Sequence, residues 1–258
     1  MHILRTVYST ILESLFPLSS TERELLSFTP KQALITLPKS PSLPISHSSA
    51  VFAYKDERVS KMIWNIKYKK SAHDVSLAGY ALHEFLKGRI YSNPAMISTT
   101  STVVPSIAAI LIPLPNTPKR RRERGYNQCE LIVDEILRVH NEEHILQDIR
   151  ENNASINRIT SGDSLLQTFI VNKTLLIRTQ HTSHQKMKDR KGRLESAKGI
   201  FAVDEDRLKR ALMIDPQFKT RPLIIIDDVV TTGSTMKEAM ETLRVAGFTE
   251  ARGLAIAH

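Results

Sequence analysis

The apolar and polar positions between residues 223 and 257 predict a strand, a turn, a helix and a second strand. Residues 223–226 are four apolar residues with no polar alternate face, which is typical of a buried parallel strand. Residues 251–257 form a second apolar run, and Gly247 before it is a natural helix end. The helix between them has one apolar stripe at spacings of three and four, made by Met236, Ala239, Met240, Leu243 and Ala246. This is a βαβ unit, and ligands in such sheets bind at the carboxyl ends of the strands.

The turn of this unit combines two carboxylates with hydroxyl groups and a glycine. Asp227 and Asp228 end the strand, and a hydroxyl-rich turn follows through Thr235. Gly233 allows close approach of an anion, and the free N–H groups of the helix start favour a phosphate. The carboxylates suit sugar hydroxyls or a hydrated Mg²⁺ instead. The turn therefore indicates a ribose 5-phosphate ligand, although a strand that ends in two exposed acids before a capped helix is the plain alternative.

A second strand, turn and helix lie at residues 106–139, and their turn is basic. Residues 106–114 are mostly apolar and predict a central strand. Five cations occur within residues 119–124, and a helix capped by Asn127 follows. Cations beside helix N–H donors form an anion site. A solvated basic loop or a nucleic-acid patch is the alternative interpretation.

The remaining pattern predicts shorter elements around these two units. Helices are expected at 3–16, 56–66 and 75–88, and strands at 175–177 and 200–203. The Pro- and Ser-rich stretch 28–49 predicts extended structure, with a candidate edge strand at 34–37, and residues 141–170 predict an irregular surface excursion. Residues 182–198 are strongly basic and poor in apolar side chains, so we expect a mobile lid over a phosphate ligand. A charged surface helix is the alternative there.

Composition narrows the class of protein. The chain has 258 residues, of which 41% are hydrophobic, so one large domain with an extension can bury a core. The net charge of +9 suits a pyrophosphate and equally a nucleic acid. The single cysteine, Cys129, excludes a disulfide framework and a cysteine zinc site. Neither a signal-peptide pattern nor a long apolar run is present, so we expect a cytoplasmic protein.

Asp227 to Thr235 resembles the phosphoribosyl pyrophosphate motif of type I phosphoribosyltransferases. Three further segments are similar to the competence protein F (ComF) family, which shares that fold. Ile112-Pro-Leu-Pro115 and Arg122-Glu-Arg-Gly-Tyr-Asn-Gln128 match its strand and arginine-rich turn. Ile66-Lys67-Tyr68 resembles a helix end of the family. Its lid pattern is matched at Thr182, Gln185, Arg193, Gly199 and Phe201, with Ser196 in place of an asparagine and Lys188 in place of an apolar residue.

The resemblance implies an α/β fold with a mainly parallel, phosphoribosyltransferase-type sheet flanked by helices. The matches span residues 51–258, which we predict to be the phosphoribosyltransferase-like domain. The family usually opens with a zinc ribbon of Cys-x-x-Cys pairs, and residues 1–50 contain no cysteine. We therefore expect residues 1–50 to be an N-terminal extension without zinc.

The resemblance also implies a ligand, phosphoribosyl pyrophosphate with Mg²⁺, and a role for each matched residue. Asp227 and Asp228 are expected to bind ribose hydroxyls and Mg²⁺, and Arg193 is expected to act with them in catalysis. The substrate-binding residues it implies are Val230, Thr231, Thr232, Gly233, Ser234 and Thr235 for the 5-phosphate, Arg120, Arg121, Arg122, Arg124, Gly125, Asn127 and Gln128 for the pyrophosphate, and Lys67, Gln185 and Lys188 around them.

Three functions follow from this resemblance. The leading one is a phosphoribosyltransferase, linked through the family to DNA uptake in natural transformation. The second is a non-catalytic adaptor for single-stranded DNA or for DNA-uptake and recombination proteins, although few aromatic residues flank the basic segments in sequence. The third is a nucleotide salvage enzyme. The acceptor, turnover and oligomeric state stay open at this point.

Overall fold

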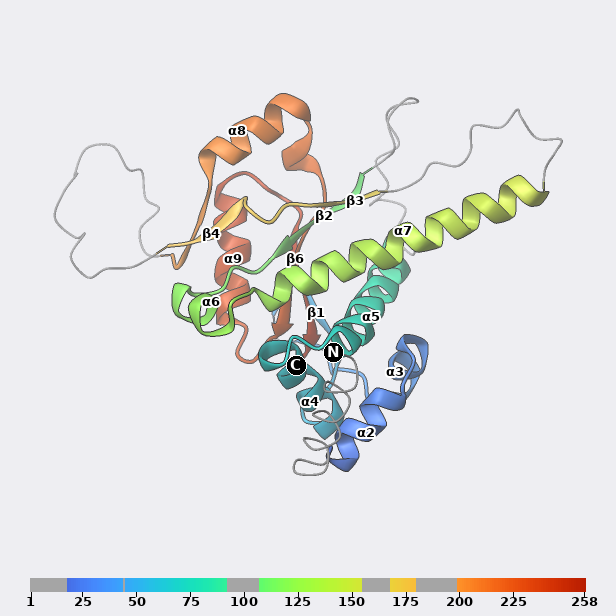
Figure 1. The fold of residues 1–258 in the computed structure, drawn as a ribbon. Coiled ribbons are helices and arrows are strands. Elements are labelled where there is room, and N and C mark those ends of the chain that lie inside the picture. The colour runs from blue at the N-terminus through green and yellow to red at the C-terminus, as the bar shows by residue number, and fades with distance from the viewer. Residues whose placement is uncertain (1–17, 44, 92–106, 155–167, 180–198) are drawn as a thin grey trace, which may run out of the picture.

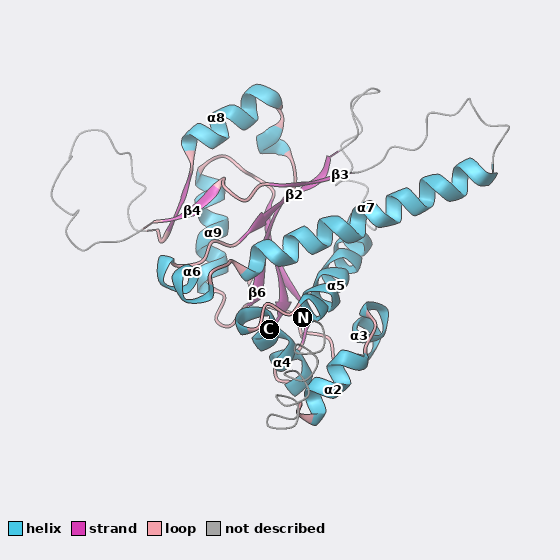
Figure 2. Ribbon diagram, viewed as in Figure 1, coloured by secondary structure: helices cyan, strands magenta, loops and turns pink. Residues whose placement is uncertain are grey.

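The computed structural model describes residues 18–43, 45–91, 107–154, 168–179 and 199–258 (Figure 1). Its centre is a parallel sheet of five strands in the order β1-β7-β6-β2-β3. A separate antiparallel pair is formed by β4 and β5. This mixed architecture confirms the predicted α/β fold with a parallel sheet flanked by helices (Figure 2). The strands are β1 (Ser48–Phe52), β2 (Ile107–Pro113), β3 (Thr168–Val171), β4 (Leu176–Arg178), β5 (Phe201–Val203), β6 (Leu223–Val229) and β7 (Ala251–Ala257).

The central strands are mainly apolar because both faces of the sheet are covered. Along β6, Ile224 and Ile226 enter one core, whereas Leu223 and Ile225 enter the other. Side chains of α4 (Glu57–Tyr68), α5 (Ala72–Tyr91) and α7 (Gln128–Ala154) fill the first core. The second core receives α9 (Ser234–Val245), α8 (Glu205–Ile214), the short 3-10 helix Phe218–Thr220 and the β4–β5 pair.

The order of the strands brings the two predicted ligand turns together. β2 pairs with β6 in parallel, and Pro113 lies opposite Ile226. The basic segment follows β2, and the paired aspartates end β6. Because neighbouring parallel strands end at the same edge of the sheet, both turns lie at one edge.

Two local predictions were wrong. Residues 34–36 belong to α3 (Pro30–Thr36), with Leu37 as its C-cap, rather than to an edge strand, because Thr29 and Gln32 form a capping box and Pro30 occupies the first helical turn. Of the irregular excursion predicted at 141–170, residues 141–154 instead continue α7, residues 168–170 lie in β3, and residues 155–167 lie outside the described residues. The polar character of residues 141–154 reflects a helix that carries ion pairs such as Arg138–Glu142, at 2.5 Å, and that runs on past the sheet (Figure 1).

The segment before residue 50 packs on the same core as the helices that follow. α2 (Ser20–Ser27) contributes Leu25, and α3 with its C-cap contributes Ala33 and Leu37, all three at 1% exposure or less. β1 itself runs across residue 50, and the division of the chain there stays a prediction. The helix expected at 3–16 lies outside the described residues. Among the helices of the described part, none has the length and apolar character needed to cross a membrane.

Candidate functional site

The site is built around the paired carboxylates at the end of β6. Asp228 is 5% exposed, and both of its carboxylate oxygens have partners. Lys67 Nζ lies 3.2 Å from Oδ1, and Gln128 Nε2 donates a hydrogen bond of 2.7 Å to Oδ2. Lys67 ends α4 and Gln128 begins α7, so three elements far apart in sequence meet at this one side chain.

The hydrogen bonds to the Asp227 side chain are made through one carboxylate oxygen, Oδ1. Its Oδ1 accepts hydrogen bonds from the Asp228 backbone N–H, at 2.8 Å, and from the Cys129 thiol, at 3.6 Å. Burial and the neighbouring charge of Asp228 raise the pKa of Asp227 to about 7, and the charge of Lys67 opposes that rise. The two acids together hold more negative charge than their surroundings neutralise. Such a pair is suited to a cation or to hydroxyl donors.

Cys129 is a hydrogen-bond donor to this pair and not a nucleophile. It is 1% exposed, and burial together with the charges of Asp227 and Asp228 raises the pKa of its thiol well above the usual value. A thiol that stays protonated is unreactive.

Gln128 joins the basic segment to the acidic pair. Its Oε1 accepts hydrogen bonds from Arg124 Nη1, at 2.8 Å, and from Asn116 Nδ2, at 2.9 Å. Asn127 caps α7 as predicted: its Oδ1 accepts the Cys129 N–H at 3.1 Å, and its Nδ2 donates to Leu114 O at 3.1 Å. Both amide side chains are buried, so within this structure they hold the turn in position.

The arginines expected on a turn lie on a short helix, α6 (Pro118–Arg124). Thr117 caps it, and Gly125 ends it with a φ of 76°. The arginines are not equivalent. Arg124 bonds to Gln128, whereas Arg121 pairs with Glu130 at 2.9 Å. Arg120 and Arg122 are exposed.

The end of α4 contacts this basic helix and the residue that follows its cap. Tyr126 donates its hydroxyl to Ile66 O at 2.7 Å, and the Arg124 guanidinium lies 5.1 Å from the centre of the Tyr68 ring. The structure therefore brings together Lys67, Arg124 and the Asp227–Asp228 pair, which sequence analysis had placed in one site.

The hydroxyl-rich turn lies beside the acids at the start of α9. Gly233 has a φ of 77°, and an added Cβ would lie 1.6 Å from Ile45 Cδ1, so only glycine fits. No side chain caps α9 at this residue. Thr232 and Ser234 hydroxyls lie 3.1 Å apart beside its first turn. The Ser234 N–H makes only a long hydrogen bond of 3.5 Å to Thr232 Oγ1, and weakly bonded N–H groups with neighbouring hydroxyls suit a phosphate. Val230, Thr231 and Thr235 complete the turn, and Val230 is buried with its N–H bonded to Ala257 O.

Arg178 at the end of β4 was missed in the sequence analysis. Its guanidinium donates to Pro115 O at 3.5 Å. Burial and the charge of Arg120 lower its pKa, while the charges of Glu238 and Asp227 act in the opposite direction. Arg178 thus lies in the electrostatic field of the site. A lone arginine after three apolar residues carries no sequence signal, since only the β4–β5 pairing places it there.

Gln185, Lys188 and Arg193 lie outside the described residues. The strands on either side of their segment are antiparallel neighbours, and the Thr179 N–H bonds to Ile200 O at 2.9 Å.

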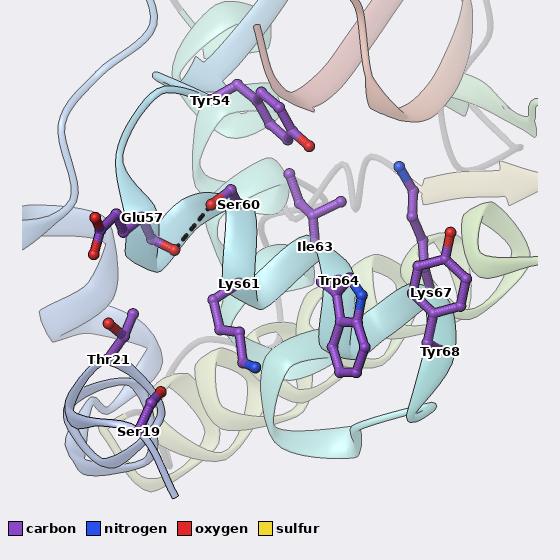
Figure 3. A pocket seen from close by; sticks show the side chains of 10 residues that line it. All are labelled: Ser19, Thr21, Tyr54, Glu57, Ser60, Lys61, Ile63, Trp64, Lys67 and Tyr68. Carbon is purple, nitrogen blue, oxygen red and sulfur yellow. Dashed lines mark hydrogen bonds between the residues drawn. The ribbon is translucent and has the colours of Figure 1, made fainter.

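An open groove of about 540 Å³ lies along the exposed face of α4, next to Lys67 (Figure 3). Trp64 and Tyr68 project into it, 44% and 59% exposed, with ring centres 5.4 Å apart. Lys61 and Lys69 lie 4.7 and 5.4 Å from the Trp64 ring. The sequence shows few aromatic residues near its basic segments, and the fold places the exposed Trp64 and Tyr68 rings of α4 beside Arg124 of α6.

One comparison with known proteins finds a relative in the family that the motifs resemble. No protein-family model matches the sequence. The chain is 28% identical over 140 residues to Competence protein F of Haemophilus influenzae, an alignment that covers 54% of this chain and 46% of that protein. A ComF-like relationship is therefore supported. The chain spans about half the length of this curated relative.

Proposed function

We propose that this chain is a ComF-like phosphoribosyltransferase-type protein that binds phosphoribosyl pyrophosphate with Mg²⁺. One observation carries the proposal. The paired acids, the uncapped α9 start at Gly233 and the Arg124–Gln128 contact to Asp228 lie at one edge of the sheet. A ribose that carries a 5-phosphate and a pyrophosphate needs hydroxyl acceptors, a phosphate cradle and cations in this arrangement.

Different residues of the site would bind different parts of the ligand. The turn of Thr231 to Thr235 would hold the 5-phosphate, and Asp227 and Asp228 would accept hydrogen bonds from the ribose hydroxyls. Arg120, Arg122 and Arg124 would face the pyrophosphate, with Arg178 as a further cation. Lys67 stays on Asp228 and limits the repulsion between the two acids.

The paired carboxylates also fit a hydrated Mg²⁺. Asp227 and Asp228 place two carboxylates side by side with Lys67 paired to Asp228, and carboxylate oxygens are the protein ligands that Mg²⁺ uses. When bound, Mg²⁺ would neutralise the pyrophosphate. The arginines would stabilise this leaving group as its bond to C1 of the ribose breaks, which is electrostatic catalysis.

Isothermal titration of phosphoribosyl pyrophosphate in Mg²⁺ buffer tests the proposal. We expect one site per chain, and at least a tenfold loss of affinity in the double variant Asp227→Ala, Thr232→Ala. Asp134→Ala is the matched control, because that carboxylate is 52% exposed and pairs with Lys173 away from the site. The proposal fails if the folded protein does not bind, or if the double variant binds as the wild type does.

Turnover and the link to competence require separate tests. Release of pyrophosphate with bases, amines or single-stranded DNA as acceptors would establish an enzyme and its substrate. The relative's name associates it with competence, so we propose a role in DNA uptake for this chain. Deletion of the gene should then lower transformation frequency, and an unchanged frequency would exclude that role.

The groove on α4 favours a second candidate function, an adaptor for single-stranded DNA. Exposed aromatic rings flanked by cations stack bases and contact phosphates. Trp64 is the single tryptophan of the chain, so its fluorescence reports binding directly. A thymidine oligonucleotide should quench it at low salt, and the affinity should fall steeply as salt rises.

Fluorescence anisotropy of the labelled oligonucleotide tests the contact residues. Tyr68→Ala and Trp64→Ala should each weaken binding, whereas Met213→Ala, an exposed side chain on α8, should not. Negligible affinity at low salt would exclude direct DNA binding and leave a protein-adaptor role.

A further inference from the structure

A cluster of imidazole and carboxylate groups lies between α5 and α7, away from the candidate site. It consists of His83 and Glu84 on α5 and Glu143 on α7. Each offers one ligand atom, and these atoms all lie within 4.8 Å of one another. No other such group of histidine, cysteine and acidic residues occurs in the described part of the chain.

His83 has an unsatisfied nitrogen that faces this cluster. The residue is 1% exposed, and its Nδ1 has no hydrogen-bond partner among the described residues. Glu84 Oε1 lies 3.5 Å from this nitrogen, which is at the long limit of a hydrogen bond. Its other nitrogen, Nε2, lies 3.4 Å from His140 Nδ1. A buried nitrogen without a partner needs an explanation, and a ligand is one.

The ammonium of Lys87 pairs with the carboxylates of Glu84 and Glu143. Its Nζ lies 2.5 Å from Glu84 Oε1 and 3.0 Å from Glu143 Oε2. Two acids and one ammonium leave a net negative charge beside the buried His83 imidazole. The Lys87 side chain is 34% exposed, so its ammonium can move into solvent when a stronger cation arrives.

We propose that His83, Glu84 and Glu143 bind a zinc-class divalent cation, for which Lys87 is the internal competitor. One imidazole nitrogen with two carboxylates suits Zn²⁺, and solvent would complete four-coordination. Mg²⁺ prefers oxygen ligands alone and should bind poorly here. We expected no zinc because residues 1–50 contain no cysteine pairs, whereas these ligands lie on α5 and α7 and are brought together by helix packing.

This site is separate from the proposed function. Residues 140–143 follow Gln128, which contacts Asp228, by at least three turns, so the cluster lies about 20 Å along α7 from Gln128. The ion would join α5 to α7 and would stabilise the folded state through binding alone.

Zinc titration of the full chain, without an affinity tag and after treatment with a chelator, tests the proposal. No phosphoribosyl pyrophosphate is added, so failure here is independent of failure at the other site. We expect binding of Zn²⁺ with at least a tenfold loss of affinity in His83→Gln and in Glu143→Gln. Lys87→Met should bind Zn²⁺ several-fold more tightly, because the competing ammonium is gone. Glu142→Gln is the control, since this exposed neighbour pairs with Arg138 and should not change the affinity.

Co²⁺ provides a second readout that a change in stability alone would not move. The bound ion should give visible absorption from nitrogen and oxygen ligands, and His83→Gln should abolish it. Circular dichroism confirms that each variant is folded. The proposal is overturned if Zn²⁺ affinity is unchanged in His83→Gln, or if Lys87→Met binds Zn²⁺ no better than the wild type.

Discussion

At Asp227, the arrangement that suits a ligand works against the stability of the free protein. The pKa of this carboxyl is raised to about 7 from 3.8, so the folded state holds a proton that the unfolded state has released. The contribution of Asp227 to stability is therefore complete below pH 3.8 and is lost as the pH rises through 7.

Asp227→Asn should make the protein more stable at pH 8 and less dependent on pH. The amide keeps the shape of the side chain and removes the repulsion from Asp228. We expect a melting temperature a few degrees higher at pH 8, a smaller gain at pH 5, and loss of phosphoribosyl pyrophosphate binding. Calorimetric scans between pH 5 and 8 measure this, and a variant less stable than the wild type at pH 8 would contradict the assigned environment.

Gly233→Ala should destabilise the turn that we assign to the 5-phosphate. A residue with a Cβ at this φ of 77° costs about 1–2 kcal/mol, and the contact with Ile45 adds to that. Urea denaturation measures the loss. Gly88→Ala is the matched control, because an added Cβ meets nothing within 4 Å there and α5 should gain about 0.5–1 kcal/mol. Ile45→Ala should restore only the steric part of the loss.

At the scale of elements, the contact between α4 and the start of α7 decides whether Lys67 reaches Asp228. Tyr126 joins them through its hydroxyl, which bonds to Ile66 O one residue before Lys67. Tyr126→Phe should lower the free energy of unfolding by about 0.5–1.5 kcal/mol. It should also weaken phosphoribosyl pyrophosphate binding, since Lys67 loses its fixed position. Tyr54→Phe, at a 40% exposed ring, should change neither quantity.

Helix and strand identities followed from sequence where the pattern was strong. The apolar run of β6, the stripe of α9 and the Asn127 cap of α7 were all predictable, because each depends on residues close in sequence. The helix at Pro30 and the long polar end of α7 were not, because capping and ion pairs there outweigh the composition on which the predictions rested.

At the scale of the whole molecule, residues 18–37 share one core with the sheet. Leu25→Ala should cost about 2–5 kcal/mol, because the side chain is 1% exposed and truncation leaves a cavity. Leu26→Ala, at 52% exposure, is the adjacent control and should have little effect. Unfolding followed by Trp64 fluorescence and by circular dichroism should coincide. Two separate transitions would show that this segment is an independent unit.

The sequence by itself determined the parallel sheet and the two turns that suggest a phosphorylated sugar. Buried strands and helix starts depend on residues that are close in sequence, so local patterns indicate them. It also indicated Lys67 through resemblance. Only the tertiary structure decided that Gln128 links Arg124 to Asp228, that Arg178 faces the same site, that the α4 aromatics form a groove, and that His83 meets Glu143. These contacts join residues far apart in sequence, and their distances depend on strand order and helix packing, which no local pattern specifies.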